Sequence, residues 1–348
     1  MHPVPVCGVD ISKDHFDAAI ARPTPDSPIT DSVRHMQTEA GRKRLALWLR
    51  RHAPDAVVVL EDTGVYSLRL ERALIDAGFA VFRVNPTILR NSRPSVGRTK
   101  SDPLDARLLA DAGRIILLTK PALLDRFRVI PGDAFDNLAL WNAERHRVAQ
   151  RIVEQKNVLE AVALNTASDA ATLADEIRKD LESLARRARQ LKGCIERAAI
   201  AADKRAYELL LSINGIGVLA GAALLESIRS IKRFASPDAL KAFLGWYPSV
   251  RGSGKVECVA HLAKHGPSLV RSLLWMAAKS AARHDPTLRA YYLKLVSRFG
   301  AQRKGASVYA WTGVARRLVQ IVWGVLHSGK TYDPAKCAPR LTRVEIVA

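Results

Sequence analysis

Residues 56–60, Ala-Val-Val-Val-Leu, are the feature that most restricts how this chain can fold. An unbroken apolar run of this length is typical of a β-strand that other elements cover on both faces. Two further apolar runs, at 4–11 and 79–84, have the same character, and the segment 40–52 has its apolar residues at helical spacing. The chain therefore predicts an α/β domain around a buried sheet.

The order of these elements narrows the fold class further. Turns and a Pro-rich loop join the first three strands, which predicts an antiparallel meander. A helix, a strand, a second helix and another strand follow before a third helix begins near residue 102. This is the element order of a ribonuclease-H-like domain, although periodicity alone establishes only α/β. The predicted strands span 4–11, 15–21, 32–36, 56–60 and 79–84.

The segment 98–107 carries two acids, Asp102 and Asp105, at the start of that third helix. Pro103 is tolerated in a first helical turn, and the i, i+3 spacing puts both carboxylates on one helical face. Two acids so close repel one another, and a divalent cation between them would reverse that effect. Because the helix dipole also favours acids in a first turn, a solvated helix start is the alternative interpretation.

Two further acids, Asp10 and Glu61, each end an apolar strand. In the ribonuclease-H-like order these two strands are neighbours, so their acids come close together. A helix beside them that carries Asp102 and Asp105 gives four carboxylates around one pocket. Oxygen ligands in that number suit Mg²⁺ or Mn²⁺, and two such ions clamp the attacking and leaving oxygens of a phosphodiester. Taken singly, Asp10 is equally well explained as a turn residue.

The net charge of the 348-residue chain is +20 at pH 7, which indicates a polyanionic partner. Residues 251–330 contain 14 Lys and Arg against two acids, Glu257 and Asp285, so most of the excess lies there. An anionic membrane is the other candidate polyanion, but no amphipathic anchor accompanies this charge.

The four cysteines are dispersed and form no Cys-x-x-Cys pair, so neither a disulfide framework nor a zinc site is expected. The sequence also shows no secretory leader and no apolar run of about 18 residues. We therefore expect a soluble, cytoplasmic protein without membrane contact.

Residues 121–205 are rich in charge and helical in their spacing. After the Pro131-Gly132 break, apolar residues recur at three and four through 133–165 and 168–205, with a turn between them. An antiparallel helical hairpin or a coiled-coil dimer arm fits this pattern. A solvated face best explains the charges, and contact with RNA or DNA is the alternative.

Gly215-Ile216-Gly217 separates two apolar helical segments, which is the pattern of a helix-hairpin-helix element. Glycine lets the backbone approach closely, and the free N–H groups at a helix start can hold a phosphate. A plain helix turn capped by glycine is the alternative. We expect close packing together with contact of Gly215 and Gly217 to a DNA backbone.

Ser253 lies between Gly252 and Gly254 in a basic segment. The glycines leave its hydroxyl open, and nearby cations would stabilise charge on an attacked phosphate. From the residues alone, a flexible Gly-Ser loop is the favoured interpretation. Ser249, which follows Pro248 and lacks flanking glycines, is the rival nucleophile. The candidate nucleic-acid contacts among the basic side chains are Arg98, Lys100, Arg251, Lys255, Lys264 and Arg271.

These motifs, in this order, resemble the DEDD transposases of insertion sequences, the insertion-sequence-110 family. The resemblance covers residues 6 to about 328 and is specific as an ordered set. At one position Ser101 stands where Thr is frequent, which removes no candidate ligand. The matching pieces are Gly8-Val9-Asp10, Glu61-x-Thr63-Gly64-Val65-Tyr66, Asn85-Pro86, Lys100-Ser101-Asp102-x-x-Asp105-Ala106, Ile213-x-Gly215-Ile216-Gly217, and Ser253-Gly254-Lys255 followed by Lys264-x-Gly266.

The resemblance implies a RuvC-like N-terminal domain in which Asp10, Glu61, Asp102 and Asp105 bind Mg²⁺. It implies that Ser253 forms a covalent link to a DNA phosphate. It also implies a noncoding bridge RNA that pairs with donor and target DNA. A dimer of dimers would form on the DNA, in which a serine of another protomer completes each carboxylate site. A nucleoid-associated location in the bacterial cytoplasm goes with that role.

We therefore predict an RNA-guided DNA transposase of mixed architecture. A RuvC-like mixed sheet with helices is expected at 1–120, a coiled-coil-like middle at 121–205, a mainly α C-terminal domain at 206–330, and an irregular, dispensable tail at 331–348. The first alternative is a hydrolytic Holliday-junction resolvase, in which water attacks and Ser253 only binds phosphate. The second is a nucleic-acid-binding protein with an inactive core.

Overall fold

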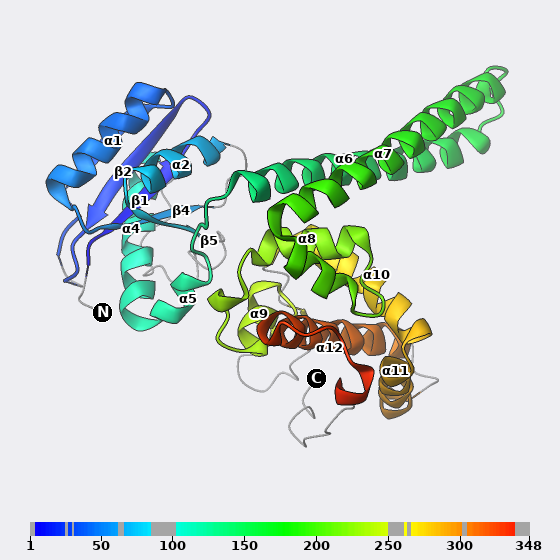
Figure 1. Cartoon of the computed structure of the whole chain (residues 1–348). Coiled ribbons are helices and arrows are strands. Elements are labelled where there is room, and N and C mark those ends of the chain that lie inside the picture. Colours follow the sequence, from blue (N-terminus) through cyan, green and yellow to red (C-terminus); the bar gives the residue numbers. More distant parts are fainter. Residues whose placement is uncertain are drawn as a thin grey trace, which may run out of the picture. The chain divides into compact units, whose positions relative to one another are not determined.

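The computed structural model divides the chain into two compact units, Met1–Pro131 and Gly132–Ala348 (Figure 1). Each unit has its own hydrophobic core. The described residues are 4–24, 27–29, 31–61, 66–84, 102–249, 261–262, 266–300 and 305–337, without the side chains of 102–104, 248–249 and 261–262.

The first unit is built on five strands, β1 (Val6–Ile11), β2 (His15–Ala21), β3 (Ser32–Met36), β4 (Val57–Glu61) and β5 (Ala80–Val84). They form one mixed sheet in the order β3-β2-β1-β4-β5. The first three strands pair antiparallel, whereas β1 pairs with β4, and β4 with β5, in parallel. The sheet confirms the predicted meander and mixed architecture, and it adds the strand directions.

Helices cover both faces of this sheet, which explains why its central strands are apolar throughout (Figure 1). On one face, Val58 and Leu60 of β4 lie in a core with α1 (Glu39–His52) and α2 (Leu68–Asp76). On the other face, Val59 lies in a core with α4 (Asp102–Thr119) and α5 (Pro121–Asp125). The unbroken apolar run therefore serves two cores at once.

The first unit extends beyond residue 120, where the sequence predicted a boundary. The N–H of Arg83 donates to the carbonyl of Phe127 at 2.9 Å, and the N–H of Val129 donates to the carbonyl of Val81 at 2.8 Å. The chain after α5 thus runs along β5 and adds hydrogen bonds to the edge of the sheet. The border between the two units falls at Pro131.

The second unit begins with two long helices, α6 (Asp133–Ala163) and α7 (Ala170–Leu211), which form the antiparallel hairpin that the spacing predicted (Figure 1). Val148 and Leu191 lie in a small core between them. α7 is broken at Asp203, which has an extended backbone and accepts a hydrogen bond from the N–H of Ala206 at 2.9 Å. Asp203 therefore caps a separate last helical segment.

The rest of the second unit folds around one apolar core that also includes Leu138 of α6 and Leu210 of α7. The base of the hairpin is thus part of this core. Within the described ranges, no helix has the length and apolar character that crossing a membrane requires. The further elements are α8 (Val218–Ile228), η2 (Ile231–Arg233), α9 (Pro237–Phe243), β6 (Pro248–Ser249), β7 (His261–Leu262), α10 (Ser268–His284), α11 (Pro286–Phe299), α12 (Ala306–Ser328) and η3 (Pro334–Cys337).

The start of the predicted tail, residues 331–337, packs against this core, and its dispensability stays a prediction. The N–H of Tyr332 donates to Ser212 Oγ at 2.9 Å, and its hydroxyl donates to Asp285 Oδ2 at 2.9 Å. Asp285 is fully buried. Tyr332 therefore satisfies a polar group inside the second unit, a long-range contact that local sequence pattern does not reveal.

Candidate active site

Asp10 and Glu61 lie at the carboxyl ends of two adjacent parallel strands, each one position beyond the register pairs of β1 and β4. Side chains alternate between the two faces of a strand, so Asp10 shares a face with Val6, and Glu61 shares a face with Val59. Both valines belong to the core beneath α4. The two acids therefore lie on the same face of the sheet, the one that α4 covers.

A third acid, Asp17, lies in the same row across the sheet. It is the register partner of Asp10 on β2, and Arg34 is its own partner on β3. Asp17 is 4% exposed. The Nε and Nη2 groups of Arg34 donate to its two carboxylate oxygens at 2.9 and 2.8 Å. The ion pair satisfies both oxygens, so Asp17 is a structural neighbour of the predicted ligands.

The sequence interpretation did not single out Asp17 or Arg34. The available signal was an acid inside the apolar strand 15–21, because a buried acid requires a partner. Its partner lies 17 residues further along the chain, and only the strand register identifies it.

α4 makes its closest approach to the sheet at Gly8. A Cβ atom on Gly8 would lie 2.2 Å from the backbone nitrogen of Ala110 and 2.4 Å from the carbonyl oxygen of Ala106, so only glycine fits there. Further along the helix, Gly113 lies against Val6, nearer the start of β1. α4 therefore runs antiparallel to β1, and its first turn lies toward the carboxyl ends of the strands.

The spacing along the two elements brings the acids to one level. From Ala106 back to Asp102 the helix rises ~6 Å, and from Gly8 to Asp10 the strand rises ~6–7 Å. The first turn of α4 therefore lies level with Asp10. Asp105 belongs to that turn and is half-buried.

Carboxylates from β1, β4 and α4 are the hard oxygen donors that Mg²⁺ and Mn²⁺ prefer, so the donor set fits a divalent ion. Among the side chains that the structure describes, no three His, Cys, Asp or Glu groups are arranged to hold a metal. The side chain of Asp102, the fourth predicted ligand, lies outside the described residues.

The predicted nucleophile Ser253 also lies outside the described residues, but the ends of its segment are defined. β6 and β7 pair antiparallel, with Ser249 opposite His261. The roles of this segment stay predictions, as do those of the other candidates outside the described part, Arg98, Lys100, Arg251, Lys255 and Lys264.

The two glycines of the predicted helix-hairpin-helix turn differ in their surroundings. Gly215 has a φ of +93°, and a Cβ there would lie 2.6 Å from the carbonyl oxygen of Ala277 in α10. Gly217 caps the start of α8, is exposed, and has no described neighbour within 4 Å of a Cβ position. Packing explains Gly215. Contact with a phosphate stays a prediction. Of the two glycines, Gly217 has the backbone that is open to such a contact.

Arg271, a predicted nucleic-acid contact, anchors a chain segment in the second unit. Its guanidinium donates to the carbonyl of Gly266. A Cβ on Gly266 would lie 2.3 Å from the backbone of Leu244, so this residue is pressed against the end of α9. Burial lowers the pKa of Arg271. These contacts give Arg271 a structural role, and contact with nucleic acid stays a prediction.

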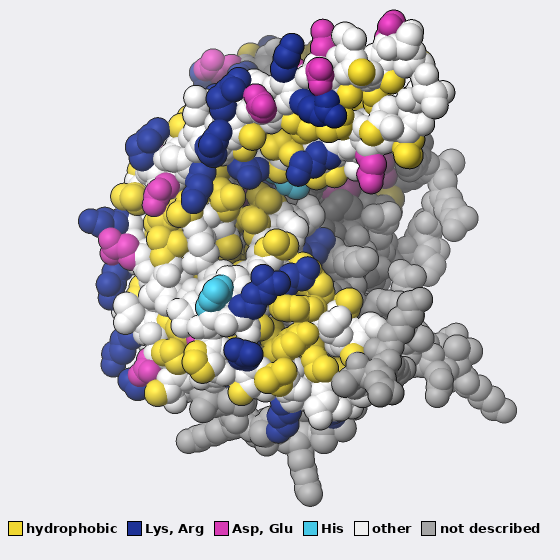
Figure 2. Space-filling view, turned by 90° about the vertical axis from the view of Figure 1, so that its right-hand side faces the viewer, with side chains coloured by type: hydrophobic (Ala, Val, Ile, Leu, Met, Phe, Trp, Pro, Cys, Tyr) yellow, Lys and Arg dark blue, Asp and Glu magenta, His cyan; other side chains and the backbone are white. Residues whose placement is uncertain are grey.

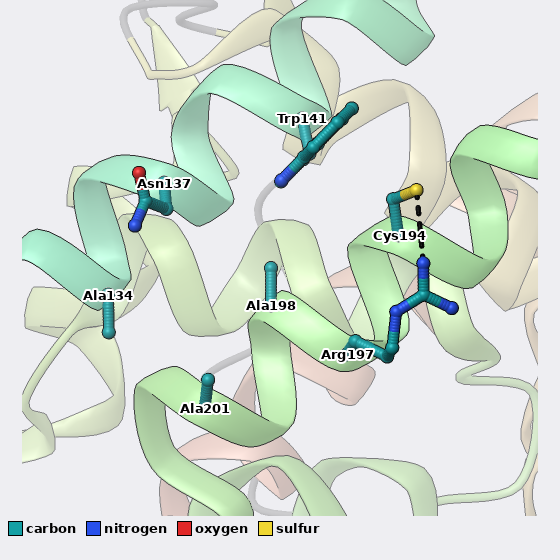
Figure 3. A pocket seen from close by; sticks show the side chains of 7 residues that line it. All are labelled: Ala134, Asn137, Trp141, Cys194, Arg197, Ala198 and Ala201. Carbon is teal, nitrogen blue, oxygen red and sulfur yellow. Dashed lines mark hydrogen bonds between the residues drawn. The ribbon is translucent and has the colours of Figure 1, made fainter.

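A hollow of about 390 Å³ opens between α6 and α7. Figure 3 shows that Arg197 is directed along its own helix toward Cys194, to which it donates at 3.3 Å. The other walls are mainly alanine and tryptophan, which is the chemistry of helix packing rather than catalysis. None of the predicted catalytic residues lines it; the lining residues are Ala134, Asn137, Trp141, Cys194, Arg197, Ala198 and Ala201.

Comparison with known families gives two matches that together cover most of the chain. A DEDD transposase model of the IS110 type matches residues 7–167, which include the mixed sheet and α4. The model of the Transposase IS116/IS110/IS902 family matches residues 207–293, which include α8 and α10.

Full-length relatives agree with these matches. The transposase for insertion sequence element IS1111A of Coxiella burnetii is 24% identical over 95% of this chain and 92% of its own length. A protein of Pseudomonas aeruginosa named as a probable family 20 transposase is 23% identical over 82% of this chain and 88% of its own. The resemblance carried by the motifs is thereby confirmed. The chain belongs to the IS110 family of transposases, with a ribonuclease-H-like sheet followed by a helical part.

Proposed function

We propose that this DNA transposase cuts and rejoins strands at its insertion sequence with a carboxylate site and a serine nucleophile, guided by a bridge RNA. Asp10, Glu61, Asp102 and Asp105 would bind Mg²⁺, with Mn²⁺ as a substitute, and Ser253 would be the nucleophile. DNA binding and the use of a divalent metal are general properties of the family to which the chain belongs. The serine step, the guide RNA, the assembly and the choice of ion are the substance of the proposal.

The observation that supports it most is the backbone contact between α4 and Gly8. It brings the first turn of α4 level with the strand ends that carry Asp10 and Glu61. Four acids from three elements would then share one edge of the sheet. Several carboxylates at one edge would supply the hard oxygen ligands that a divalent ion prefers, which is the physical reason to expect a metal there.

The chemistry follows from the residue types. A bound Mg²⁺ ion would withdraw charge from the scissile phosphate. The Ser253 hydroxyl would release its proton to water as Oγ bonds to phosphorus. One DNA oxygen would leave with the electron pair of the broken P–O bond and take up a proton from water. The resulting phosphoserine ester conserves the energy of that bond, so rejoining needs no nucleotide hydrolysis. Arg251 and Lys255 would stabilise charge on the attacked phosphate.

Charge and exposed apolar surface support the remaining partners. The net charge of +20 suits both DNA and a guide RNA. The α6–α7 hairpin leaves Val153, Val158 and Leu173 between 46% and 58% exposed. A second copy of the chain would cover these side chains, in agreement with the dimer and the tetramer on DNA that the resemblance implies.

Covalent trapping tests the proposal. The full chain is incubated with Mg²⁺, RNA transcribed from the flanks of the element, and labelled DNA that carries the element junction. The variants are Ser253→Ala and Glu61→Gln. Two controls match them: Ser249→Ala for the serine, and Asp76→Asn for the acid, because Asp76 is an exposed acid that pairs with Arg72 on α2.

We expect a protein–DNA adduct with the wild type and both controls. Ser253→Ala should give no adduct, and Glu61→Gln should lower the rate of adduct formation more than about 100-fold. Cleavage without an adduct, unchanged in Ser253→Ala, would favour the hydrolytic resolvase. DNA binding without any Mg²⁺-dependent cleavage would favour the inactive nucleic-acid-binding protein. Loss of activity on omitting the RNA would support the guide.

A further inference from the structure

Three helices of the second unit, α10, α11 and α12, carry eight Lys and Arg and no acid. The one acid between α10 and α11, Asp285, is fully buried. It accepts hydrogen bonds from Asn214, Leu288 and Tyr332, so it serves the interior. Figure 2 shows Lys and Arg side chains among hydrophobic ones on one face of this unit. Such a surface favours a polyanion that also offers apolar area.

A hollow of about 260 Å³ opens where the three helices meet. Tyr292 of α11 and Trp311 of α12 form its aromatic wall, with ring centroids 4.7 Å apart. The exposed side chains of Arg283 and Arg289 also line it. Lys279 places its Nζ 5.8 Å from the centroid of the Trp311 ring. An aromatic wall and cations thus lie together in one concave site.

We infer that this hollow receives one unpaired base of a single-stranded nucleic acid, stacked on Tyr292 and Trp311. Every base has a flat π face, so stacking on aromatic side chains depends little on sequence. Arg283 and Arg289 would hold the phosphates on either side of that base. The hollow is smaller than the ~300–1,000 Å³ typical of small-molecule sites, which suits one ring system better than a whole nucleotide.

The aromatic wall is the reason to prefer an unpaired strand. Bases in a duplex are stacked on one another, so their faces are closed to a protein ring. Contact with a duplex backbone would use the arginines alone, and the aromatic wall would take no part in binding. The inference rests on the proposed function only for the source of unpaired strands, which strand exchange and a guide RNA both provide.

Fluorescence anisotropy of the full chain with labelled oligonucleotides, without Mg²⁺, tests this inference apart from cleavage. The probes are a strand of abasic residues with one central thymine, the same strand with no base, and a duplex, with the strands made in both DNA and RNA form. Tyr292→Leu removes the ring and keeps an apolar side chain. Tyr309→Leu is the matched control, because Tyr309 is an exposed ring of α12 that stacks on Phe299 instead.

We expect Tyr292→Leu to weaken binding of the one-base strand about tenfold and to leave the baseless strand and the duplex unchanged. Tyr292→Trp keeps an aromatic face, so it should bind the one-base strand more tightly than the baseless strand, as the wild type does. Arg283→Gln should weaken binding of the strands with and without the base alike. It should also lower the slope of log affinity against log salt concentration by about the amount that one phosphate contact contributes. Tyr309→Leu should change none of these values.

Two results would overturn the inference. One is that Tyr292→Leu and Tyr309→Leu change the affinity for the one-base strand equally. The other is that Tyr292→Leu changes the affinity for the duplex and the baseless strand as much as that for the one-base strand. They would show that this surface contacts the nucleic-acid backbone without stacking a base. A stronger effect on DNA or on RNA would support it and identify the strand. Because the readout needs no catalysis, failure of the serine chemistry would leave this result unchanged, and failure here would leave the trapping result unchanged.

Discussion

Gly8 and Ala110 are in backbone contact: a Cβ atom on Gly8 would lie 2.2 Å from the amide nitrogen of Ala110. The contact fixes where α4 crosses β1, and with it the level of the helix start that carries Asp102 and Asp105. The candidate active site therefore depends on a residue that has no side chain to contribute. Its role is to let a helix and a strand approach more closely than any other residue allows.

Gly8→Ala should destabilise the first unit by about 2–4 kcal/mol, because the added methyl group meets backbone that cannot yield without moving α4. Urea unfolding of the full chain measures this. Gly113→Ala is the control, since the nearest atoms to its methyl group would be side-chain atoms of Val6 and Val59, each 2.9 Å away. It should cost less, because valine side chains adjust more readily. Equal costs would contradict a fixed approach of α4.

Arg34→Met should destabilise the first unit by about 2–3 kcal/mol, because it leaves the Asp17 carboxylate buried without its bidentate partner. The cost is below that of a fully buried pair, since the Arg34 side chain is 50% exposed and screened by water. Urea unfolding measures the effect. The double variant Asp17→Asn, Arg34→Met should recover part of the loss, because no charge is left unpaired. A double variant as unstable as Arg34→Met alone would show that the pair is not the cause.

Tyr332→Phe should lower the stability of the second unit by about 1.5–3 kcal/mol, because its hydroxyl donates to the buried carboxylate of Asp285. Truncation after Lys330 should cost more, since it also removes the N–H that donates to Ser212. Truncation after Cys337 is the control and should cost little. Thermal unfolding distinguishes these variants. If both truncations leave stability unchanged, the whole tail is dispensable, as the sequence alone suggested.

Burial raises the pKa of the Cys7 thiol from its ordinary value of 9.0 to about 12. Between these two pH values the unfolded chain releases a proton that the folded chain keeps, so Cys7 should lower stability as pH rises from 9.0 toward about 12. The Cys7→Ala variant should lack this dependence. Urea midpoints measured across that range check the difference, and parallel curves for the two proteins would contradict it.

The same burial should protect Cys7 from alkylation in the native state. Cys194 is partly exposed and should react first of the two. Peptide mapping after a short treatment with iodoacetamide near pH 8 measures both. Reaction of Cys7 at the rate of Cys194 would show that β1 opens readily.

Local pattern was sufficient for most of the fold. Apolar runs predicted β1, β4 and β5 within a residue or two, because a strand covered on both faces needs apolar side chains at every position. Helical spacing predicted the α6–α7 hairpin for the same kind of reason. The Pro131-Gly132 break was visible too, yet the chain before it belongs to the sheet edge, which only its hydrogen bonds to β5 reveal.

The candidate site divides in the same way. Acids at strand ends and at a helix start predicted Asp10, Glu61, Asp102 and Asp105 as ligands, because local sequence alone marks each of these positions. The partner of Asp17 did not follow from the sequence, since pairing across a sheet depends on register. Close backbone packing at Gly215 was predicted, but its contact partner, Ala277 of α10, was not.

The sequence by itself therefore determined the elements, the mixed class and the residue types of a metal-dependent DNA transposase, because these depend on periodicity and on side-chain chemistry. Only the tertiary structure decided that β1 and β4 are parallel, that α4 crosses β1 at Gly8, and that Arg34 satisfies Asp17. Each of these joins residues distant in the chain. Such contacts are set by how preformed surfaces fit together, and no local pattern records that fit.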